Sequence, residues 1–455
     1  MLSTLGQVAA DVAGALAGAD VPVTGVAVDS RQVSPGAVFV AIRGHHVDGH
    51  DFAAAAVAAG GAAALAERPL DVPHVLVPDT VAALGRWAMA HRSRLDAHVT
   101  GITGSVGKTG TKDLLAALLA ESGPTIAPPG SYNNDVGLPL TVLRADEQTR
   151  HLVLEMGARA AGDIARLCRI GRPQVGVVLN VGSAHLGEFG SRQAIAAAKG
   201  ELAEAASDLV VLNADDPYVA GMAGRSSAPV RWFGAGGSVR AEQLALTEGG
   251  RPAFVLMADE GRAPVRMRLV GLHQVPNALA AAAVALHLGI GIDDVARVLS
   301  TTAPASRWRM EVVERPDGVT IVNDAYNANP DSVRAAIDAT LAIATPAGRR
   351  SWAVLGAMLE LGADSEAEHE AIGAYATTQG IDRVLAVGPE AAAVQRGAGT
   401  GAHAARDLDG ALALLRREVA VGDVVLIKAS RGARLEQLAQ ALLENAGVDG
   451  RERNR

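Results

Sequence analysis

The chain has 455 residues, a length that suggests about three domains. Its net charge of −8 argues against a general nucleic-acid binder, and its 49% hydrophobic and 20% charged residues exclude bulk disorder. The single cysteine, Cys168, excludes a disulfide framework and a cysteine-based metal site, and it fits a reducing compartment. The first basic residue is Arg31, so no signal peptide is expected, and the longest apolar run, 278–288, is too short to span a membrane. We therefore expect a cytoplasmic, multidomain protein.

The N-terminal stretch is expected to form a small α/β domain over residues 1–80. Its apolar runs predict a helix over 51–59 and short strands over 23–28, 37–42, 62–65 and 74–77. A predicted helix over 80–95 leads away from it.

The second block, residues 81–313, alternates strands with helices. Its strands are predicted from short, nearly continuous apolar runs at 98–103, 151–156, 175–181 and 208–212. Helical patterns follow the first strand as far as about residue 121 and cover 192–206. Such alternation predicts an α/β sheet.

The third block, residues 314–455, repeats the alternation. Strands are predicted over 319–323, 352–355, 383–387 and 424–428. The helices between and after them are predicted over 332–344, 366–379, 408–419 and 434–445. This pattern predicts a Rossmann-like, doubly wound domain.

The use of lysine is unusual, because only four of the 41 basic residues are lysines: Lys108, Lys112, Lys199 and Lys428. Arginine is bulkier, cannot be deprotonated and lacks a nucleophilic amine. Each remaining lysine is therefore a candidate for a task that arginine cannot perform.

The strongest local motif lies between the strand 98–103 and the next helix. It consists of Gly104, Ser105, Val106, Gly107, Lys108 and Thr109. Glycines allow backbone N–H groups to point at phosphate oxygens, the lysine can reach the β- and γ-phosphates, and the threonine can bind Mg²⁺. The strict pattern G-x-x-x-x-G-K-[ST] fails at Ile102. The flanking elements and the scarce lysine favour nucleotide binding over a glycine-rich turn with a chance Lys-Thr pair.

Three polar residues extend this hypothesis. Glu155 ends the strand 151–156 at the edge where α/β ligands bind, so it is a candidate metal ligand; the alternative is a solvated strand end. His185 follows the strand 175–181, and the alternative is a loop histidine without a ligand. Lys199 lies among alanines in the helix 192–206. An ordinary exposed helical lysine is the alternative, which the shortage of lysine disfavours.

Together with further segments in the same order, these residues resemble the Mur ligase family from about residue 24 to about 440. The additional segments are Asp29–Arg31, Asp48–His50, Tyr132–Pro139, Glu155–Ala158, Ala198–Glu201, Asn213–Asp216, His273–Asn277, Arg309–Glu311, Asp324–Pro330, Glu360–Gly362 and Lys428–Arg431. The resemblance implies an N-terminal domain for a UDP-sugar, a central P-loop ATPase domain and a C-terminal Rossmann-like domain. It also implies that ATP activates a carboxylate as an acyl phosphate, which an amine then attacks.

The resemblance implies a nucleotide and metal site. Lys108 and Thr109 would handle the phosphates and one Mg²⁺, while Asn277 would contact adenine, Arg309 would contact ATP and Asp324 would bind ribose. Two Mg²⁺ sites are implied, with Thr109, Glu155, His185 and Lys199 as ligands. Lys199 would carry a CO₂-derived carbamate, which only a primary amine can form; a bare Lys199 that contacts phosphate or solvent is the alternative. Lys108, Lys199, His185 and Asn134 are the implied catalytic residues.

On the substrate side, the resemblance implies that Ser30 and Arg31 bind the uridine end, with a turn closed by a surface salt bridge as the alternative. Asn133 and Asn134 would lie near the activated substrate. Two further substrate contacts, Asn327 and Asn329, belong to the segment 326–330, which resembles family members that add D-alanyl-D-alanine to UDP-N-acetylmuramoyl-tripeptide.

Two positions depart from the family pattern. Gln274 stands where the family usually has Asn, and Ala357 stands where Asp often precedes Met-x-Glu-Leu-Gly. Three other functions stay open: a sister ligase that adds one amino acid, a folylpolyglutamate synthase-like enzyme, and a P-loop switch without ligase chemistry. We expect a monomer that binds no nucleic acid.

Overall fold

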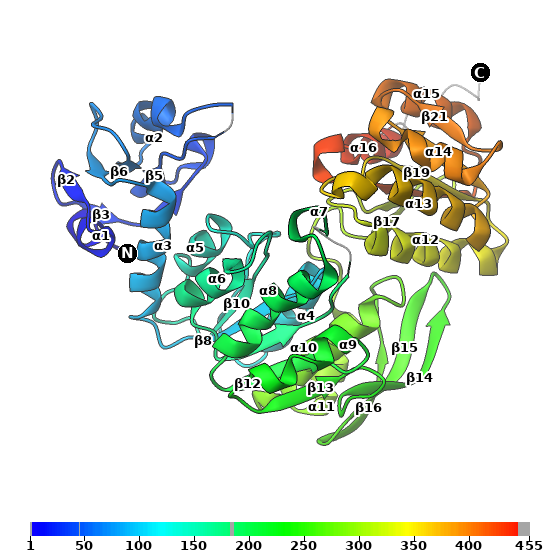
Figure 1. Cartoon of the computed structure of the whole chain (residues 1–455), viewed down its shortest axis with the longest axis horizontal. Helices are drawn as coiled ribbons and strands as arrows, with labels where there is room; N and C mark the ends of the chain where they lie inside the picture. The colour runs from blue at the N-terminus through cyan, green and yellow to red at the C-terminus, as the bar shows by residue number, and fades with distance from the viewer. Residues whose placement is uncertain (1, 45, 183–185, 445–455) are drawn as a thin grey trace.

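The computed structural model describes residues 2–44, 46–182 and 186–444. Three α/β domains follow one another along the molecule, and the central domain lies between the other two (Figure 1). Largely parallel sheets form the frame of each domain, which confirms the predicted fold class.

A five-stranded sheet forms the N-terminal domain, in the order β2-β7-β6-β5-β4, and β2 is its only antiparallel member. These strands are Ala15–Ala17 (β2), Gly25–Ala27 (β4), Ala37–Val40 (β5), Ala63–Ala66 (β6) and His74–Leu76 (β7). The prediction of one strand over 23–28 is wrong. Pro22–Val23 (β3) pairs with Ser3–Thr4 (β1). The backbone N–H of Thr24 then donates to the carbonyl of Gly36 before β4 begins.

The N-terminal domain shares a hydrophobic core with the central one. Helix α2 (Ala53–Ala58) stays within the N-terminal domain, whereas α1 (Leu5–Val12) and α3 (Thr80–Arg92) pack towards the centre. Buried side chains of α1 and α3 belong to the same cluster as those of α5 (Gly137–Val142) and α6 (Asp163–Gly171). Helix α3 is thus a packed connection and not a free linker.

The central sheet has six parallel strands in the order β13-β12-β11-β8-β10-β9. They are His98–Thr103 (β8), Thr125–Ile126 (β9), His151–Glu155 (β10), Val175–Val178 (β11), Leu209–Asn213 (β12) and Val230–Phe233 (β13). The chain runs from β8 to β9 and β10 on one side and then to β11, β12 and β13 on the other. The strand order therefore reverses at β8, and ligands of such sheets bind at the carboxyl ends beside this point.

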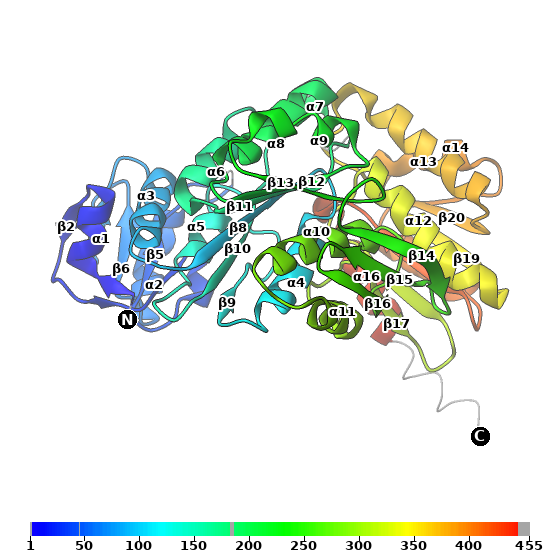
Figure 2. The same ribbon diagram turned by 90° about the horizontal axis from the view of Figure 1, so that it is seen from below.

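Helices cover both faces of the central sheet, as Figure 2 shows. One face carries α4 (Lys108–Leu119), α10 (Gln274–His287) and α11 (Ile292–Thr301), and the other carries α6 and α8 (Arg192–Ala205). Two short helices, α7 (Leu186–Phe189) and α9 (Pro217–Ala220), flank α8 in sequence. Helix α10 contains most of the apolar run 278–288 and lies in the core. Among the described residues, no helix is long and apolar enough to cross a membrane.

An antiparallel three-stranded sheet completes the central domain and was not predicted. Its strands are Arg240–Thr247 (β14), Arg251–Ala258 (β15) and Gly261–Arg266 (β16). Most of β14 is exposed, and a bulge interrupts its pairing with β15 between residues 242 and 245. A strand of this kind buries too little surface to leave an apolar run in the sequence.

The C-terminal sheet has the order β17-β18-β22-β19-β20-β21, and only β17 is antiparallel. Its strands are Glu311–Glu314 (β17), Thr320–Asn323 (β18), Ser351–Leu355 (β19), Arg383–Val387 (β20), His403–Ala405 (β21) and Val424–Lys428 (β22). One face is covered by α12 (Pro330–Ala344), α13 (Ser365–Gln379) and α14 (Ala392–Ala398), and the other by α15 (Leu408–Glu418) and α16 (Glu436–Glu444). This arrangement confirms the doubly wound prediction. The insertion of β22 between β18 and β19 creates a second point of reversal.

Candidate active site

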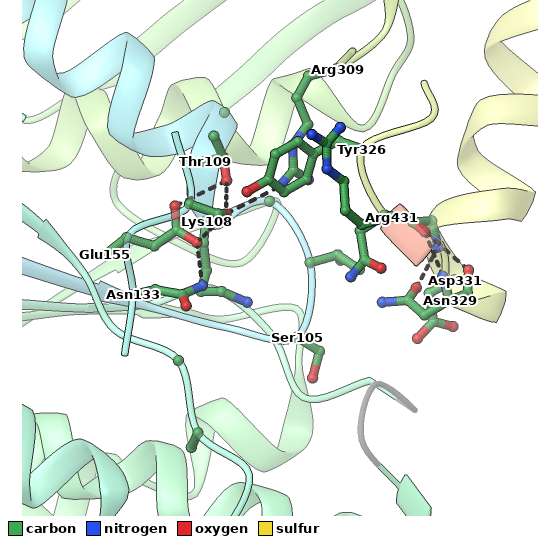
Figure 3. Close-up of a pocket in the computed structure, with 18 of the residues that line it drawn as sticks. Ser105, Lys108, Thr109, Asn133, Glu155, Arg309, Tyr326, Asn329, Asp331 and Arg431 are labelled. Carbon is green, nitrogen blue, oxygen red and sulfur yellow. Dashed lines mark hydrogen bonds between the residues drawn. The ribbon is translucent and has the colours of Figure 1, made fainter. Parts of the chain in front are cut away.

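A cavity of about 830 Å³ lies where the central and C-terminal domains meet (Figure 3). Central-domain side chains reach it from the carboxyl ends of β8 and β10, and C-terminal ones from those of β18 and β22. Three of the four lysines line the cavity: Lys108, Lys199 and Lys428. The predicted nucleotide loop therefore faces residues from the other domain.

The loop after β8 has the backbone of a phosphate-binding turn. Gly107 has a φ of 85°, and a side chain there would come within 2.3 Å of the Asn277 amide oxygen, so only glycine fits. Gly107 caps α4 without a side-chain hydrogen bond, which leaves the first N–H groups of the helix for an anion. The Lys108 ammonium folds back and donates to the carbonyl of Gly104 at 2.6 Å. Burial, the largest effect, lowers the pKa of Lys108.

The Glu155 carboxylate is 1% exposed, which rules out the solvated strand end. It accepts hydrogen bonds from the hydroxyls of Thr109 (2.9 Å) and Ser131 (2.8 Å) and from the amide of Asn133 (2.9 Å). The two hydroxyls lie 2.9 Å apart. Figure 3 shows Thr109, Asn133 and Glu155 beside Lys108.

Hard oxygen atoms of this kind suit Mg²⁺, whose ligands are carboxylates, hydroxyls and phosphates. Among the described residues, no three His, Cys, Asp or Glu side chains lie close enough together to hold a metal ion. The protein would therefore provide one carboxylate and two hydroxyls, and phosphate or water would provide the other ligands of the Mg²⁺. The Thr109 and Glu155 pair fits one Mg²⁺ in this way. His185, assigned to the second metal, lies outside the described residues.

Lys199 lies on α8 and is 4% exposed, so the exposed-lysine alternative is wrong. Its side chain reaches the same cavity as Lys108. Burial, and then the nearby charge of Lys108, lower the pKa of Lys199 well below its ordinary value. A neutral amine is the form of lysine that reacts with CO₂, so this environment is compatible with a carbamate.

From the C-terminal side, Arg309 reaches the central domain and donates to the Ser131 hydroxyl at 3.1 Å. Its guanidinium stacks 4.2 Å from the centre of the Tyr326 ring, and its buried Nε has no hydrogen-bond partner among the described residues. An unpaired buried donor at a cavity wall is suited to an anionic ligand. Asp324 already accepts from the backbone N–H of Met310 (3.0 Å) and from Lys428 (2.5 Å). Binding of ribose by Asp324 remains a prediction.

The predicted asparagines have structural partners of their own. Asn277 donates to the Gln274 side chain at 3.1 Å, so the departure at Gln274 still provides an amide partner. Asn329 caps α12 by accepting from the N–H of Ser332 at 2.9 Å, and Asn134 accepts from the N–H of Gly137 at the start of α5. All three also line the cavity, as does Asn327. Their contacts with ligands remain predictions.

Comparison with known proteins places this geometry in a family. A UDP-N-acetylmuramoyl-tripeptide–D-alanyl-D-alanine ligase of Mycobacterium bovis is 47% identical over 97% of this chain and 97% of its own length. The chain belongs to the Mur ligase family. Family models match in the same order: the Mur ligase family catalytic domain at 22–92, the middle domain at 102–285 and the glutamate ligase domain at 308–431.

Solved structures of Mur ligases share the whole fold. A crystal structure of MurF from Acinetobacter baumannii superposes with a TM-score of 0.86 at 31% identity, covering 97% of this chain and 99% of that one. MurF from Thermotoga maritima in complex with ADP superposes with a TM-score of 0.80 at 33% identity, covering 93% and 97% of the two chains.

Ser30 and Arg31, for which binding of the uridine end remains a prediction, lie in the N-terminal domain and do not line the cavity. Ser30 and Arg31 form a short 3₁₀ turn after β4, and the Asp29 side chain caps it by accepting from the backbone N–H of Arg31. Arg31 also pairs with Asp29 at 2.8 Å and its side chain is 85% exposed. This is the salt-bridged turn of the alternative reading, and the turn still presents a guanidinium to solvent.

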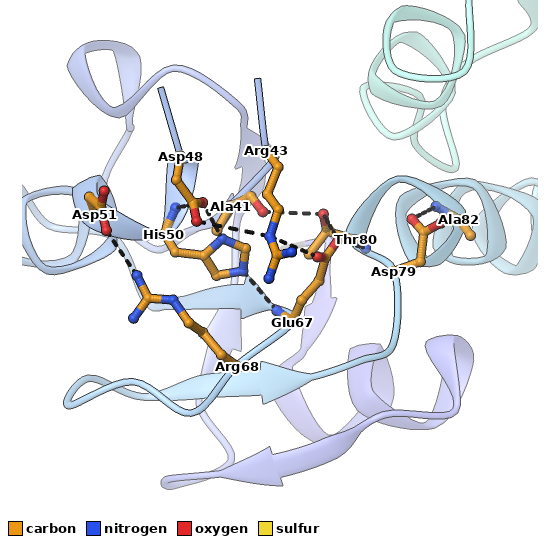
Figure 4. A network of polar contacts seen from close by, with 10 residues as sticks. All are labelled: Ala41, Arg43, Asp48, His50, Asp51, Glu67, Arg68, Asp79, Thr80 and Ala82. Atoms are coloured by element: carbon orange, nitrogen blue, oxygen red, sulfur yellow. Dashed lines mark hydrogen bonds and ion pairs between the residues drawn. The ribbon is translucent and has the colours of Figure 1, made fainter. Parts of the chain in front are cut away.

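A polar network fixes the same domain to α3 (Figure 4). The buried His50 ring contacts Asp48 at 2.5 Å and accepts from the N–H of Glu67 at 2.8 Å. The Glu67 carboxylate accepts from both the N–H and the hydroxyl of Thr80, the first residue of α3, at 3.1 Å. The motif Asp48–His50 thus holds the start of the connecting helix.

Two residues of the site were missed in the sequence. Ser131 joins Thr109, Glu155 and Arg309 through its hydroxyl. Asn180 accepts from the N–H groups of Ser105 and Val106 and so shapes the phosphate loop. Asn180 follows the buried strand β11. Glu155 was selected as a polar residue at the carboxyl end of a buried strand, and the same criterion would have found Asn180. Ser131 left no such signal.

Arg31→Ala is expected to raise the KM for the UDP-linked substrate about tenfold and to leave the KM for ATP unchanged. A hydrogen bond to a charged group contributes about 1.5 kcal/mol, which corresponds to this factor. Steady-state kinetics with each substrate varied in turn provide the measurement. Arg68→Ala is the matched control, because Arg68 forms a similar exposed pair with Asp51 at 2.8 Å in the same domain. A shift in the KM for ATP alone would refute the assignment of Arg31.

Proposed function

We propose that the chain is the ATP-dependent ligase that joins D-alanyl-D-alanine to UDP-N-acetylmuramoyl-tripeptide, releasing ADP and phosphate, in the synthesis of peptidoglycan precursors. The observation that carries the proposal is the cavity between the domains. There the phosphate loop and Glu155 face Arg309, Tyr326 and Arg431. The full-length similarity to ligases with this name supports the choice of substrates over those of a sister ligase or a folylpolyglutamate synthase-like enzyme.

The reaction requires two consecutive steps. The terminal carboxylate of the tripeptide attacks the γ-phosphorus of ATP, the bond to ADP breaks, and an acyl phosphate forms. The amine of D-alanyl-D-alanine then attacks the acyl carbon, loses a proton and expels phosphate. Lys108 and the N–H groups at the start of α4 are placed to bind phosphate oxygens, and Arg309 is placed to approach them from the other side.

Thr109 and Glu155 would hold one Mg²⁺, and a carbamate on Lys199 together with His185 would serve a second. When bound, Mg²⁺ neutralises charge on the phosphate oxygens. Lys199 supports this assignment through its burial beside Lys108, where a second uncompensated ammonium is unfavourable. A carbamate would replace that positive charge by a negative one.

We further infer a division of labour among the domains. The N-terminal domain would bind the UDP-sugar, the central domain ATP, and the C-terminal domain the amine substrate. A reactive acyl phosphate needs protection from water, which closure of the domains over the cavity would provide. We also infer that the enzyme acts in the cytoplasm, in keeping with its one buried, unpaired cysteine.

Phosphate release measured against a panel of substrates tests the function. The acceptors are UDP-N-acetylmuramoyl-tripeptides that end in lysine or in diaminopimelate, and the amines are D-alanyl-D-alanine, D-alanine and D-glutamate. We expect release only when a tripeptide acceptor and D-alanyl-D-alanine are both present. Steady phosphate release without any amine would support a P-loop switch instead, and preference for a single amino acid would support a sister ligase.

A further inference from the structure

Lys112 is the one lysine that does not line the cavity. It lies on α4, one helical turn after Lys108, and is 2% exposed. A lysine this deeply buried requires partners for its charge. Neither the phosphate loop nor the substrate assignments account for it.

The Lys112 ammonium contacts three oxygen atoms from three places in the chain. It pairs with the Asp113 carboxylate at 2.6 Å, donates to the carbonyl of Pro128 at 2.8 Å and lies 3.5 Å from the Ser306 hydroxyl. An ammonium has three N–H donors on a single compact atom, which matches three converging acceptors. Arginine is bulkier and spreads its donors over three nitrogen atoms in one plane, so lysine suits acceptors that converge on one point.

Two of these contacts hold segments that lead directly into the active site. Three residues after Pro128 the chain reaches Ser131, and three residues after Ser306 it reaches Arg309. These two side chains meet at 3.1 Å, and Ser131 also bonds to Glu155. The contacts thus close on themselves: Lys112 holds both segments, and the two segments meet again where Arg309 donates to Ser131. Ser131 also contacts Thr109 at the start of α4.

Ser306 also belongs to the connection between α11 and β17, which joins the central and C-terminal domains. Further along this connection, Trp308 and Met310 have φ values of 59° and 47°, which bulky residues rarely adopt. Arg431 stacks on Trp308 at 4.1 Å, and Asp324 accepts from the N–H of Met310. The C-terminal domain therefore fixes the end of the connection, and Lys112 fixes its beginning.

We propose that Lys112 is a positioning residue that sets the place of Arg309 relative to the phosphate loop and Glu155. It touches neither substrate nor nucleotide and acts through the segments of Pro128 and Ser306. The inference rests on the proposed function for the role of Arg309 in ATP binding. A displacement of about 1 Å in a clamp of this kind can lower a reaction rate by about 10²-fold.

Lys112→Met removes the three donors and keeps most of the side-chain volume. We expect it to weaken ATP binding, measured by calorimetry without acceptor or amine, at least about tenfold, and to lower kcat while the KM for the UDP-linked substrate stays unchanged. Ser306→Ala removes only the contact with the connection. It should change the same quantities in the same direction by about threefold, and it keeps the test decisive if Lys112→Met does not fold.

Arg92→Met is the matched control. Arg92 is 7% exposed in α3, and its guanidinium donates to the carbonyls of Gly171, Leu95 and Ala97, away from the cavity. Its loss should lower the Tm without changing the ATP affinity of the folded protein. If Lys112→Met and Ser306→Ala behave in the same way as Arg92→Met, Lys112 is merely structural and the proposal is overturned.

A double-mutant cycle with Arg309→Ala shows whether Lys112 acts through Arg309. In the Arg309→Ala background, Lys112→Met should weaken ATP binding by no more than about twofold, because the residue that it positions is gone. Fully additive losses would contradict the proposal. Since ATP binding is measured alone, the result holds whichever amine the enzyme uses, and failure of the proposed function is recognised separately in the substrate panel.

Discussion

Lys108→Ala is expected to lower the rate of ATP-dependent ligation by about 10²–10³-fold and to leave the fold intact. Removing one preorganised group that stabilises developing charge has an effect of this size. The folded state should tolerate the change, because the one hydrogen bond that the Lys108 ammonium makes with a described residue goes to Gly104 within the loop. Phosphate release at saturating ATP gives the rate, and thermal unfolding gives the stability.

Lys108→Arg serves as the charge-preserving control. Arginine keeps the positive charge but is bulkier than lysine beside Glu155 and Arg309, so it should recover only part of the rate. Turnover of Lys108→Ala near that of the native enzyme would refute the phosphate-loop assignment, however well the loop matches by sequence.

Lys199→Ala should lose most activity and regain part of it when acetate is added. Removal of this buried side chain leaves space beside Lys108. Acetate can occupy that space, and its carboxylate oxygen atoms can replace those of the carbamate. A dose-dependent recovery with acetate, absent in the native enzyme and in Lys108→Ala, is the measurement. Failure of short carboxylates to restore any activity would count against an oxygen ligand at this position.

Lys199→Arg separates charge from carbamate chemistry. The guanidinium preserves a positive charge but forms no carbamate, so the variant should be inactive and acetate should not rescue it. For the native protein under CO₂, the carbamate is first trapped by alkylation. Mass spectrometry should then find the peptide that contains Lys199 heavier by the mass of CO₂ plus that of the added alkyl group. An active Lys199→Arg enzyme would leave only a requirement for charge.

Much of the fold could be predicted because buried parallel strands leave continuous apolar runs. The runs at 383–387 and 424–428 coincide with β20 and β22. The sheet of β14, β15 and β16 was missed because its exposed outer strand mixes charged and apolar residues and a bulge interrupts it. The run 23–28 was read as one strand because periodicity carries no information about which neighbour each half will pair with.

Some residues of the candidate site could be predicted from the sequence, and others could not. Lys108 and Glu155 could be found because a scarce lysine in a glycine loop, and a carboxylate at the end of a buried strand, are unusual in any sequence. Ser131 and Lys112 could not be placed, because their partners lie in segments that are distant in the chain. Ser131 to Glu155 spans 24 positions, and Lys112 to Ser306 spans 194. Only the folded chain shows that these contacts converge.

The burial of the lysines has a practical consequence for labelling. Lys112, Lys199 and Lys428 are each 4% exposed or less, and Lys108 is partly exposed at the cavity. Apart from the terminal amine, an amine-directed reagent therefore meets one accessible lysine side chain in the folded protein, and that side chain belongs to the phosphate loop. The rate of acylation at Lys108 becomes a direct readout of whether the loop is occupied, with no engineered label and no need for a coupled assay.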